Sequence, residues 1–268
     1  MFKLKLLRAI LTIKIDFHHY NSKEDKMLKT RIVIFIAIIS IFFKVSAQTS
    51  TEVIDKYLEA THTKNALPSL KNFTYQKTYK ANASTDFTEE VSVISSENKL
   101  SRKKSILERD FFYILNDNAG WIKIPMGSRD KAPNYTIKDL NAKERTDLAD
   151  EIKDGLLPFV NFEEKGYQQL GELSSVKIDE VDCYKITISR GDTKIDYFFD
   201  SNTGLLKREI LTEGSIIHTS DITKFATTKN GVIYPSEAIY SNTKDKRRTI
   251  VTTVWVLDAI PQANMFVK

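Results

Sequence analysis

The amino-acid sequence predicts a mainly β protein with a few helices, built on an antiparallel curved sheet. Three features of the sequence indicate this fold class. Apolar and polar residues alternate with a period of two over much of the chain, which is typical of strands with one wet face. Short turns rich in Gly and Asn separate these runs, and the crossover helices that a parallel sheet requires are absent. We therefore expect a single curved sheet or open β-barrel of about twelve strands.

Residues 27–47 have the composition of a cleavable signal peptide. Lys29 and Arg31 form a short positive region, and residues 32–43 form an apolar run of twelve residues interrupted only by Ser40. A transmembrane helix needs roughly 20 apolar residues, so this run is too short to be one. We predict cleavage after Ala47 and export to the periplasm, with an uncleaved anchor as the alternative.

Residues 1–26 precede this signal, and Met27 stands where an ordinary signal peptide begins. We interpret residues 1–26 as an upstream extension produced by a wrong start, with a long n-region as the alternative. The predicted organisation is thus an extension at 1–26, a signal peptide at 27–47 and a single domain at 48–268. A chain of about 220 residues is long enough to bury one core.

Charge and cysteine content limit the function classes. The formal net charge is +5, but the first 47 residues contain nine of the 40 basic side chains and only three of the 35 acidic ones. The rest of the chain is close to neutral, so its charge does not favour a nucleic-acid partner. Cys183 is the only cysteine and lies in a strand-like run, where we expect a buried structural thiol rather than a reactive one.

A short helix is predicted at the start of the domain. Ser50 or Thr51 can cap it, and Pro68 prevents its continuation. The apolar residues that share one face of this helix are Val53, Ile54, Tyr57 and Leu58.

A second helix is predicted in the interior of the chain. Asn141 and Glu144 have the spacing of a capping box, and Gly155 fits the position just after the helix. Leu148 and Ile152 lie on one face of the segment between them.

Period-two runs fill most of the remaining domain. The strands expected before the interior helix lie at residues 73–79, 87–93, 99–107, 111–115 and 121–124, and residues 126–135 are expected to form a loop. The strands expected after it lie at residues 167–177, 181–190, 193–200, 205–212, 215–225, 232–240 and 247–258.

Motifs of catalysis and metal binding are absent from the sequence. It contains no H-E-x-x-H, C-x-x-C, G-x-S-x-G or G-x-x-x-x-G-K-[ST]. Only His62 and His218 follow the signal region, and they lie in different predicted elements. We therefore predict a protein that is not an enzyme, with no catalytic residues, no metal site and no cofactor.

A series of short motifs runs through residues 50–268. They are the helix at 53–60, Asn118-Ala119-Gly120-Trp121, Ile124-Pro125-Met126-Gly127-Ser128, Gly155-Leu156-Leu157, the run 159–166, Tyr197-Phe198-Phe199-Asp200 with Thr203-Gly204-Leu205, and Asn230-Gly231-Val232-Ile233-Tyr234-Pro235. In order and spacing they resemble the LolA-like outer-membrane lipoprotein-sorting family, in the form common in Bacteroidetes-type bacteria.

This resemblance implies an unclosed β-barrel of about eleven antiparallel strands with helices in its mouth. It also implies that the acyl chains of a lipoprotein bind between the sheet and the helices. The best-known members of the family carry an arginine, in a stretch with an Arg-Pro pair, that helps to hold the lid closed. The corresponding residues 97–102 of this chain have no Arg-Pro pair, and Arg102 is the candidate for the polar contact with the lid.

An apolar ligand cavity is the predicted site. Two short helices are little cover for the concave face of so many strands, so either the barrel closes on itself or a cavity remains that suits a long apolar ligand, and we favour the cavity. The first two strands should turn their odd-numbered side chains inward, the interior helix should pack over the same space, and a tryptophan should lie near the rim. The predicted ligand-binding residues are Phe73, Tyr75, Phe87, Val91, Val93, Trp121, Leu148 and Ile152.

Two functional interpretations remain open at this point. The first is a monomeric periplasmic carrier or chaperone that binds acyl chains, lipoproteins or another elongated apolar ligand without covalent chemistry. The alternative is an accessory or scaffold protein that binds a partner protein of the cell envelope through a sheet edge or the convex face. A hydrolase ranks third, because no nucleophile–base pair can be identified.

Overall fold

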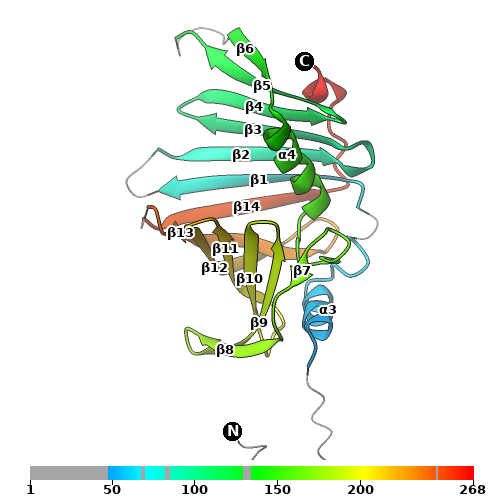
Figure 1. Cartoon of the computed structure of the whole chain (residues 1–268), viewed down its shortest axis with the longest axis vertical. Coiled ribbons are helices and arrows are strands. Elements are labelled where there is room, and N and C mark those ends of the chain that lie inside the picture. The colour runs from blue at the N-terminus through cyan, green and yellow to red at the C-terminus, as the bar shows by residue number, and fades with distance from the viewer. Residues whose placement is uncertain (1–47, 68–69, 82–84, 129–133, 246) are drawn as a thin grey trace, which may run out of the picture. The chain divides into compact units, whose positions relative to one another are not determined.

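The computed structural model describes residues 48–67, 70–81, 85–128, 134–245 and 247–268. Within these ranges the chain forms two α-helices and one antiparallel sheet of 14 strands (Figure 1). The extension and signal peptide predicted for residues 1–47 lie outside the described residues. Of the described residues, none belongs to a helix with the length and apolar character needed to span a membrane.

The strands come in two groups along the chain. Those before the interior helix are β1 (Asn72–Ala81), β2 (Phe87–Ile94), β3 (Lys99–Ile106), β4 (Arg109–Asn116), β5 (Ala119–Met126) and β6 (Asn134–Asp139). Those after it are β7 (Gln168–Gln169), β8 (Ser174–Ile178), β9 (Val181–Arg190), β10 (Thr193–Asp200), β11 (Leu206–Glu213), β12 (Ile216–Thr227), β13 (Ile233–Asn242) and β14 (Thr249–Leu257).

The sheet is continuous but not closed. Its strand order is β6-β5-β4-β3-β2-β1-β14-β13-β12-β11-β10-β9-β7, with β8 paired to β9. The last strand, β14, pairs with the first, β1, and so joins the two groups. The predicted fold class, a mainly β protein with an unclosed antiparallel sheet, is confirmed.

Two strand predictions were wrong in detail. Residues 134–139 form β6, whereas residues 126–135 were expected to be a loop, of which 129–133 lie outside the described residues. Tyr135 and Ile137 alternate with polar residues in β6, but every residue of the strand is exposed. Residues 167–177 were expected to form one strand but form β7 and β8, separated at Gly171. That glycine has a φ of +74°, in the left-handed region that interrupts a strand.

Helix α3 (Ser50–Ala60) begins one residue earlier than the predicted caps imply. Its N-cap is Thr49, whose hydroxyl accepts a hydrogen bond from the Glu52 backbone N–H at 3.2 Å. The Glu52 carboxylate accepts one in return from the Thr49 backbone N–H at 2.9 Å. This reciprocal capping box satisfies two backbone donors at once, which a cap at Ser50 or Thr51 would not do.

Helix α4 (Ala142–Asp154) has the predicted capping box. The Asn141 side chain accepts from the Glu144 backbone N–H at 3.0 Å, and the Glu144 carboxylate accepts from the Asn141 backbone N–H at 2.8 Å. Gly155 follows the helix with a φ of +62°, as its position in the sequence predicts.

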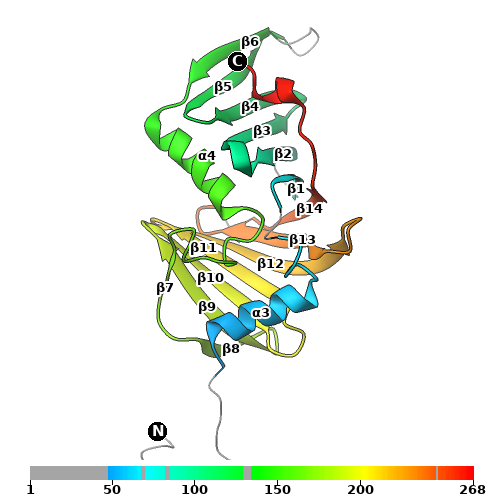
Figure 2. The ribbon, with the colours of Figure 1, turned by 90° about the vertical axis from the view of Figure 1, so that its right-hand side faces the viewer.

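The core is built from the concave face of the sheet and the two helices (Figure 2). Helix α3 packs on the part that contains β9 and β10, around the buried aromatic rings of Tyr57, Phe159, Tyr197 and Phe199. Helix α4 packs on β1 to β4 through Leu148 and Ile152. A small cluster on the opposite face joins Ile114 and Trp121 to Phe266 near the C-terminus. Together these contacts make Gln48–Lys268 one compact unit.

Candidate functional site: a cleft on the concave face

The candidate site is a cleft of about 600 Å³ on the concave face of the sheet. Its lining comes from β1 and β2, from β11 to β14, and from residues 155–159, which follow α4. Most of its walls are aromatic or aliphatic, while its floor and rim carry polar side chains. The apolar wall residues include Tyr79, Phe87, Leu156, Phe159, Val251 and Trp255. Cavities of this size and composition are typical of sites for small, mainly apolar ligands.

The register of the sheet places these side chains together. Tyr75, Lys77 and Tyr79 of β1 stand opposite Trp255, Thr253 and Val251 of β14. Because alternate residues of a strand point to the same side, all six lie on one face. On the other edge of β1, the ring of Tyr79 stacks on Phe87 of β2, with centroids 4.2 Å apart. The inward-facing side chains of β14, β1 and β2 thus form one continuous wall of the cleft.

The roof of the cleft is the segment that follows α4. Phe159 is 1% exposed and makes edge contacts with Tyr57, Tyr197 and Phe199, so this part of the roof is fixed to α3 and β10. Leu156 lines the cleft and packs against both main core clusters. The roof therefore connects the α3 and α4 parts of the core.

A polar network anchors the start of this roof. Arg190, at the end of β9, donates to both carboxylate oxygens of Asp154 at 2.8 and 3.0 Å. Tyr167 donates to the same carboxylate at 2.9 Å. The Lys165 ammonium donates to the Asp154 and Leu157 carbonyl oxygens, both at 2.8 Å. Burial lowers the pKa of Lys165 to about 8, partly opposed by the negative charge of Asp154.

The floor of the cleft carries Lys77 on β1 and Glu209 on β11. Burial raises the pKa of the Glu209 carboxyl, and the positive charge of Lys77 opposes this shift. At the rim, His218 Nδ1 lies 2.6 Å from the Tyr240 hydroxyl, and its Nε2 lies 3.6 Å from the Glu213 carboxylate. The cleft thus has a charged floor, a hydrogen-bonded rim and apolar walls.

Two of the eight predicted ligand-binding residues, Tyr75 and Phe87, line this cleft. Phe73 and Ile152 line a second hollow of about 680 Å³ beside α4, whose lining includes several charged side chains, among them Asp150, Lys153 and Glu164. That mixture of charges is less suited to an apolar chain than the aromatic walls of the cleft.

The other four predicted residues lie elsewhere. Val91 and Val93 are 0% exposed and Leu148 is 4% exposed, and all three belong to the packed core under α4. Trp121 lies on the opposite face of the sheet, against Ile114 and Phe266. The structure therefore brings Val91, Val93 and Leu148 together with Phe73 and Ile152, as predicted, but separates Trp121 from them.

Arg102, the candidate for a polar contact with the lid, reaches α4. Its guanidinium donates to the carboxylate of Glu151, which also accepts a hydrogen bond from the Tyr75 hydroxyl. Arg102 lies on β3 and Tyr75 on β1, so Glu151 connects α4 to two strands of the sheet. Burial raises the pKa of Tyr75, and the charge of Glu151 raises it further.

Several cleft residues were missed by the sequence interpretation. The most important are Lys77, Tyr79, Glu209, Tyr240, Val251 and Trp255. The alternation that marked Phe73 and Tyr75 continues to Lys77 and Tyr79, and this signal was available in the sequence. The contribution of β11 and β13 follows only from the curvature of the sheet.

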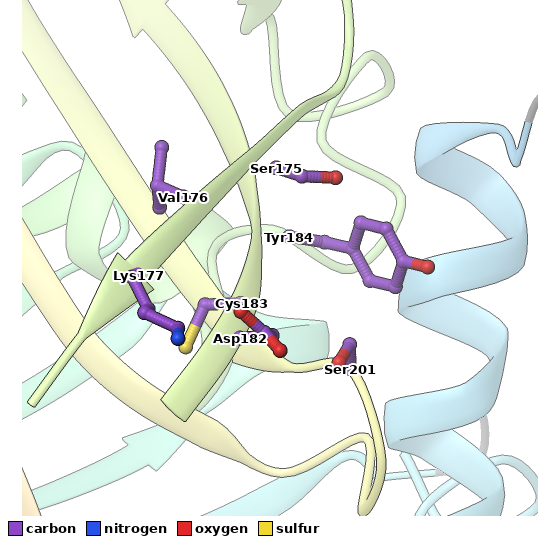
Figure 3. A pocket seen from close by; sticks show the side chains of 7 residues that line it. All are labelled: Ser175, Val176, Lys177, Asp182, Cys183, Tyr184 and Ser201. Atoms are coloured by element: carbon purple, nitrogen blue, oxygen red, sulfur yellow. The ribbon is translucent and has the colours of Figure 1, made fainter. Parts of the chain in front are cut away.

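Cys183 is 1% exposed, in agreement with the predicted buried thiol. It lines a pocket of about 350 Å³ together with residues of β8 and β9 and Ser201. Figure 3 shows Lys177 and Asp182 beside it. Burial raises the pKa of the thiol, which disfavours the nucleophilic thiolate. Across the described ranges, no group of three or more His, Cys, Asp or Glu side chains is arranged to hold a metal ion.

The chain was compared with protein families, curated proteins and solved structures, and only solved structures are similar to it. No protein-family model and no curated protein matches the sequence. A LolA superfamily protein from Nitrosomonas europaea is similar at 16% identity and a TM-score of 0.49, over 83% of this chain and 99% of that one. A putative outer membrane lipoprotein-sorting protein domain from Vibrio parahaemolyticus is similar at 10% identity and a TM-score of 0.45, over 79% and 96%. The structural neighbours of this chain thus include LolA superfamily and lipoprotein-sorting proteins, at low sequence identity.

Proposed function

We propose that this protein is an exported carrier or chaperone that binds an elongated apolar chain, such as the acyl chain of a lipid or lipoprotein, without covalent chemistry. The observation that supports this proposal most directly is the cleft of about 600 Å³ on the concave face, walled by Tyr79, Phe87, Val251 and Trp255. The motif resemblance described above implies the same class of ligand.

The size of the cleft suits one acyl chain. Burial of a methylene group contributes about 0.8 kcal/mol, so a chain of about ten methylenes gains up to about 8 kcal/mol when it is fully covered. Losses of translational and conformational freedom on binding reduce this gain. We therefore expect dissociation constants in the micromolar range or weaker, which suits a carrier that must also release its ligand.

Binding of an uncharged fluorescent dye, N-phenyl-1-naphthylamine, tests this proposal. The protein should bind the dye saturably, and compounds with a dodecyl chain should displace it. Ala238 lines the cleft on β13, and A238F should fill part of the volume and weaken binding by about tenfold or more.

The matched control is V254F. Val254 lies on β14 with its side chain 51% exposed, outside the cleft lining. V254F should bind the dye like the unsubstituted protein, and circular dichroism should show that both variants are folded. Absence of saturable binding at micromolar concentration, or equal binding by A238F, would contradict the proposal.

A second candidate function, binding of a partner protein, is favoured by a different observation. Ile250, Val254 and Val256 of β14 are 45%, 51% and 49% exposed, and they form an apolar stripe on one face of a central strand. A photo-crosslinking amino acid at Val254 should then capture one discrete envelope protein in the native host. The same amino acid at Ala238, inside the cleft, should not capture it.

A further inference from the structure

The floor of the cleft contains two opposite charges that are not paired with each other. Lys77 on β1 and Glu209 on β11 both line the cleft, and β1 and β11 are separated in the sheet by β14, β13 and β12. The curvature of the sheet brings their charges close enough for Lys77 to lower the pKa of Glu209. Even so, no ion pair between them forms in the part of the chain that the structure describes.

Glu209 is a half-buried carboxylate without a donor. Within the described ranges, no N–H or O–H donates a hydrogen bond to it. Its neighbour Arg208 points to the other face of the strand, because adjacent strand residues alternate, and Arg208 pairs with Asp221. Because Glu209 lines the cleft, a donor on a ligand can reach its carboxylate there.

Lys77 is likewise free to donate. Its ammonium lies 5.3 Å from the centre of the Tyr75 ring, and among the described residues it has no carboxylate partner in ion-pair range. Its cross-strand neighbours are Thr253 on β14, whose hydroxyl lies in the same cleft, and Glu89 on β2, which pairs with Lys104. The floor therefore offers a charged donor on one side and a charged acceptor on the other.

We propose that the cleft selects amphiphiles whose polar end is an uncharged group that both donates and accepts hydrogen bonds, an amide or a hydroxyl, held between Lys77 and Glu209. This inference rests on the proposed function, because it names the polar end of the ligand whose chain occupies the cleft. The group accepts a hydrogen bond from the Lys77 ammonium and donates one to the Glu209 carboxylate.

Amphiphiles with a charged end should fit the floor of the cleft less well. A carboxylate attracts Lys77 but faces the negative charge of Glu209, and it has no proton to donate. An ammonium attracts Glu209 but faces the positive charge of Lys77, and it cannot accept. A neutral end adds no charge to the site and leaves the charges of Lys77 and Glu209 to compensate each other.

Four ligands with the same chain test the inference: lauramide, lauryl alcohol, laurate and laurylamine, each displacing N-phenyl-1-naphthylamine from the full protein at pH 7.5. Lauramide and lauryl alcohol should bind about tenfold more tightly than laurate or laurylamine, which corresponds to one charge-assisted hydrogen bond. E209Q should improve laurate binding and weaken laurylamine binding. K77M should do the reverse.

Matched controls separate specific effects from loss of structure. Lys80 is an exposed lysine of the same strand, and Glu172 is an exposed glutamate outside the cleft lining, so K80M and E172Q should leave the order of the four ligands unchanged. Equal affinities for all four ligands, or an order that E209Q and K77M leave unchanged, would overturn the inference while the cleft still binds chains. If none of the four ligands displaces the dye, the proposed function itself fails.

Discussion

Single positions on one face of a strand have very different surroundings in this sheet. On β2, Val93 is 0% exposed beneath α4, whereas Phe87, six residues earlier on the same face, lines the open cleft. Both were predicted to contact a ligand. What separates them is the position of α4, which covers one end of the strand and leaves the other end uncovered.

Substitutions at these two positions should therefore have different effects. V93D places a charge without a partner in a packed core, which costs several kcal/mol, enough to unfold a domain of ordinary stability. F87S removes an apolar wall of the cleft, so it should weaken dye binding by about tenfold and leave the protein folded. Thermal unfolding and dye titration measure the two effects. A folded V93D variant that retains its melting temperature would show that Val93 is not in the core.

Lys165 should make the free energy of unfolding depend on pH between about pH 8 and 10.5. Its pKa is about 8 in the folded protein, below the ordinary value of 10.5, because it is buried. Above about pH 8 the unfolded chain therefore binds more protons at this residue than the folded protein does, so the free energy of unfolding should rise with pH. The buried tyrosines Tyr75 and Tyr167 have raised pKa values and oppose this trend only above about pH 10.

The substitution K165M should remove that rise. Urea unfolding between about pH 7.5 and 9.5 measures it, and the variant should give a flatter profile than the unsubstituted protein. The control is K153M, at an exposed lysine of α4, which should keep the rise. An unchanged slope in K165M would mean that Lys165 titrates normally in the folded state.

At the scale of elements, α4 is attached through two carboxylates of its last turn. Glu151 accepts hydrogen bonds from Arg102 on β3 and Tyr75 on β1, and Asp154 accepts two from Arg190 on β9. The helix thus connects both groups of strands. Because the roof of the cleft begins directly after it, the position of α4 determines where the roof lies.

Loss of the Arg102 contact should loosen α4 more than the rest of the protein. R102M leaves Glu151 with Tyr75 as its donor, and the partly exposed pair should contribute on the order of 1 kcal/mol. Hydrogen exchange should then become about fivefold faster at the amides of α4, because 1 kcal/mol corresponds to that factor. Exchange in α3 should stay unchanged. Equal acceleration in both helices would indicate general destabilisation instead of a local contact.

At the scale of the whole molecule, one sheet joins the two ends of the domain. β14 pairs with β1 over nine residue pairs, from Phe73↔Leu257 to Ala81↔Thr249, and Phe266 packs behind β4 and β5 against Ile114 and Trp121. The cleft lies beside this junction, with walls from β1 and β14. The site therefore requires strands that are far apart in the sequence.

Processing of the N-terminus is a prediction about the whole chain. If residues 27–47 are a signal peptide cleaved after Ala47, N-terminal sequencing of the exported protein should begin at Gln48. The domain starts immediately afterwards, with Thr49 as the cap of α3. Recovery of a soluble periplasmic protein that begins at Met1 or Met27 would refute the cleavage site.

Local features of the chain were predictable because their causes are local. The capping box of α4 joins Asn141 and Glu144, three residues apart, so its hydrogen bonds can be inferred from spacing alone. The alternation on β1 and β2 likewise identifies their inward faces. These features, together with the turns, determined the fold class and the inward orientation of Tyr75 and Phe87.

The face of Trp121 and the place of the cleft were decided by the tertiary structure. Trp121 stands opposite Ile114 on β4, and the register through β3 and β2 sets both on the face opposite Val93. A shift of one residue in any of these pairings would reverse that face, and the pairings are not encoded by composition. The cleft depends in addition on how far α4 extends over the sheet and on how strongly the sheet curves. The reach of α4 and the curvature of the sheet both result from many packing contacts between residues distant in the sequence. The sequence by itself therefore determined that the concave face is apolar, and the tertiary structure decided which part of that face stays open.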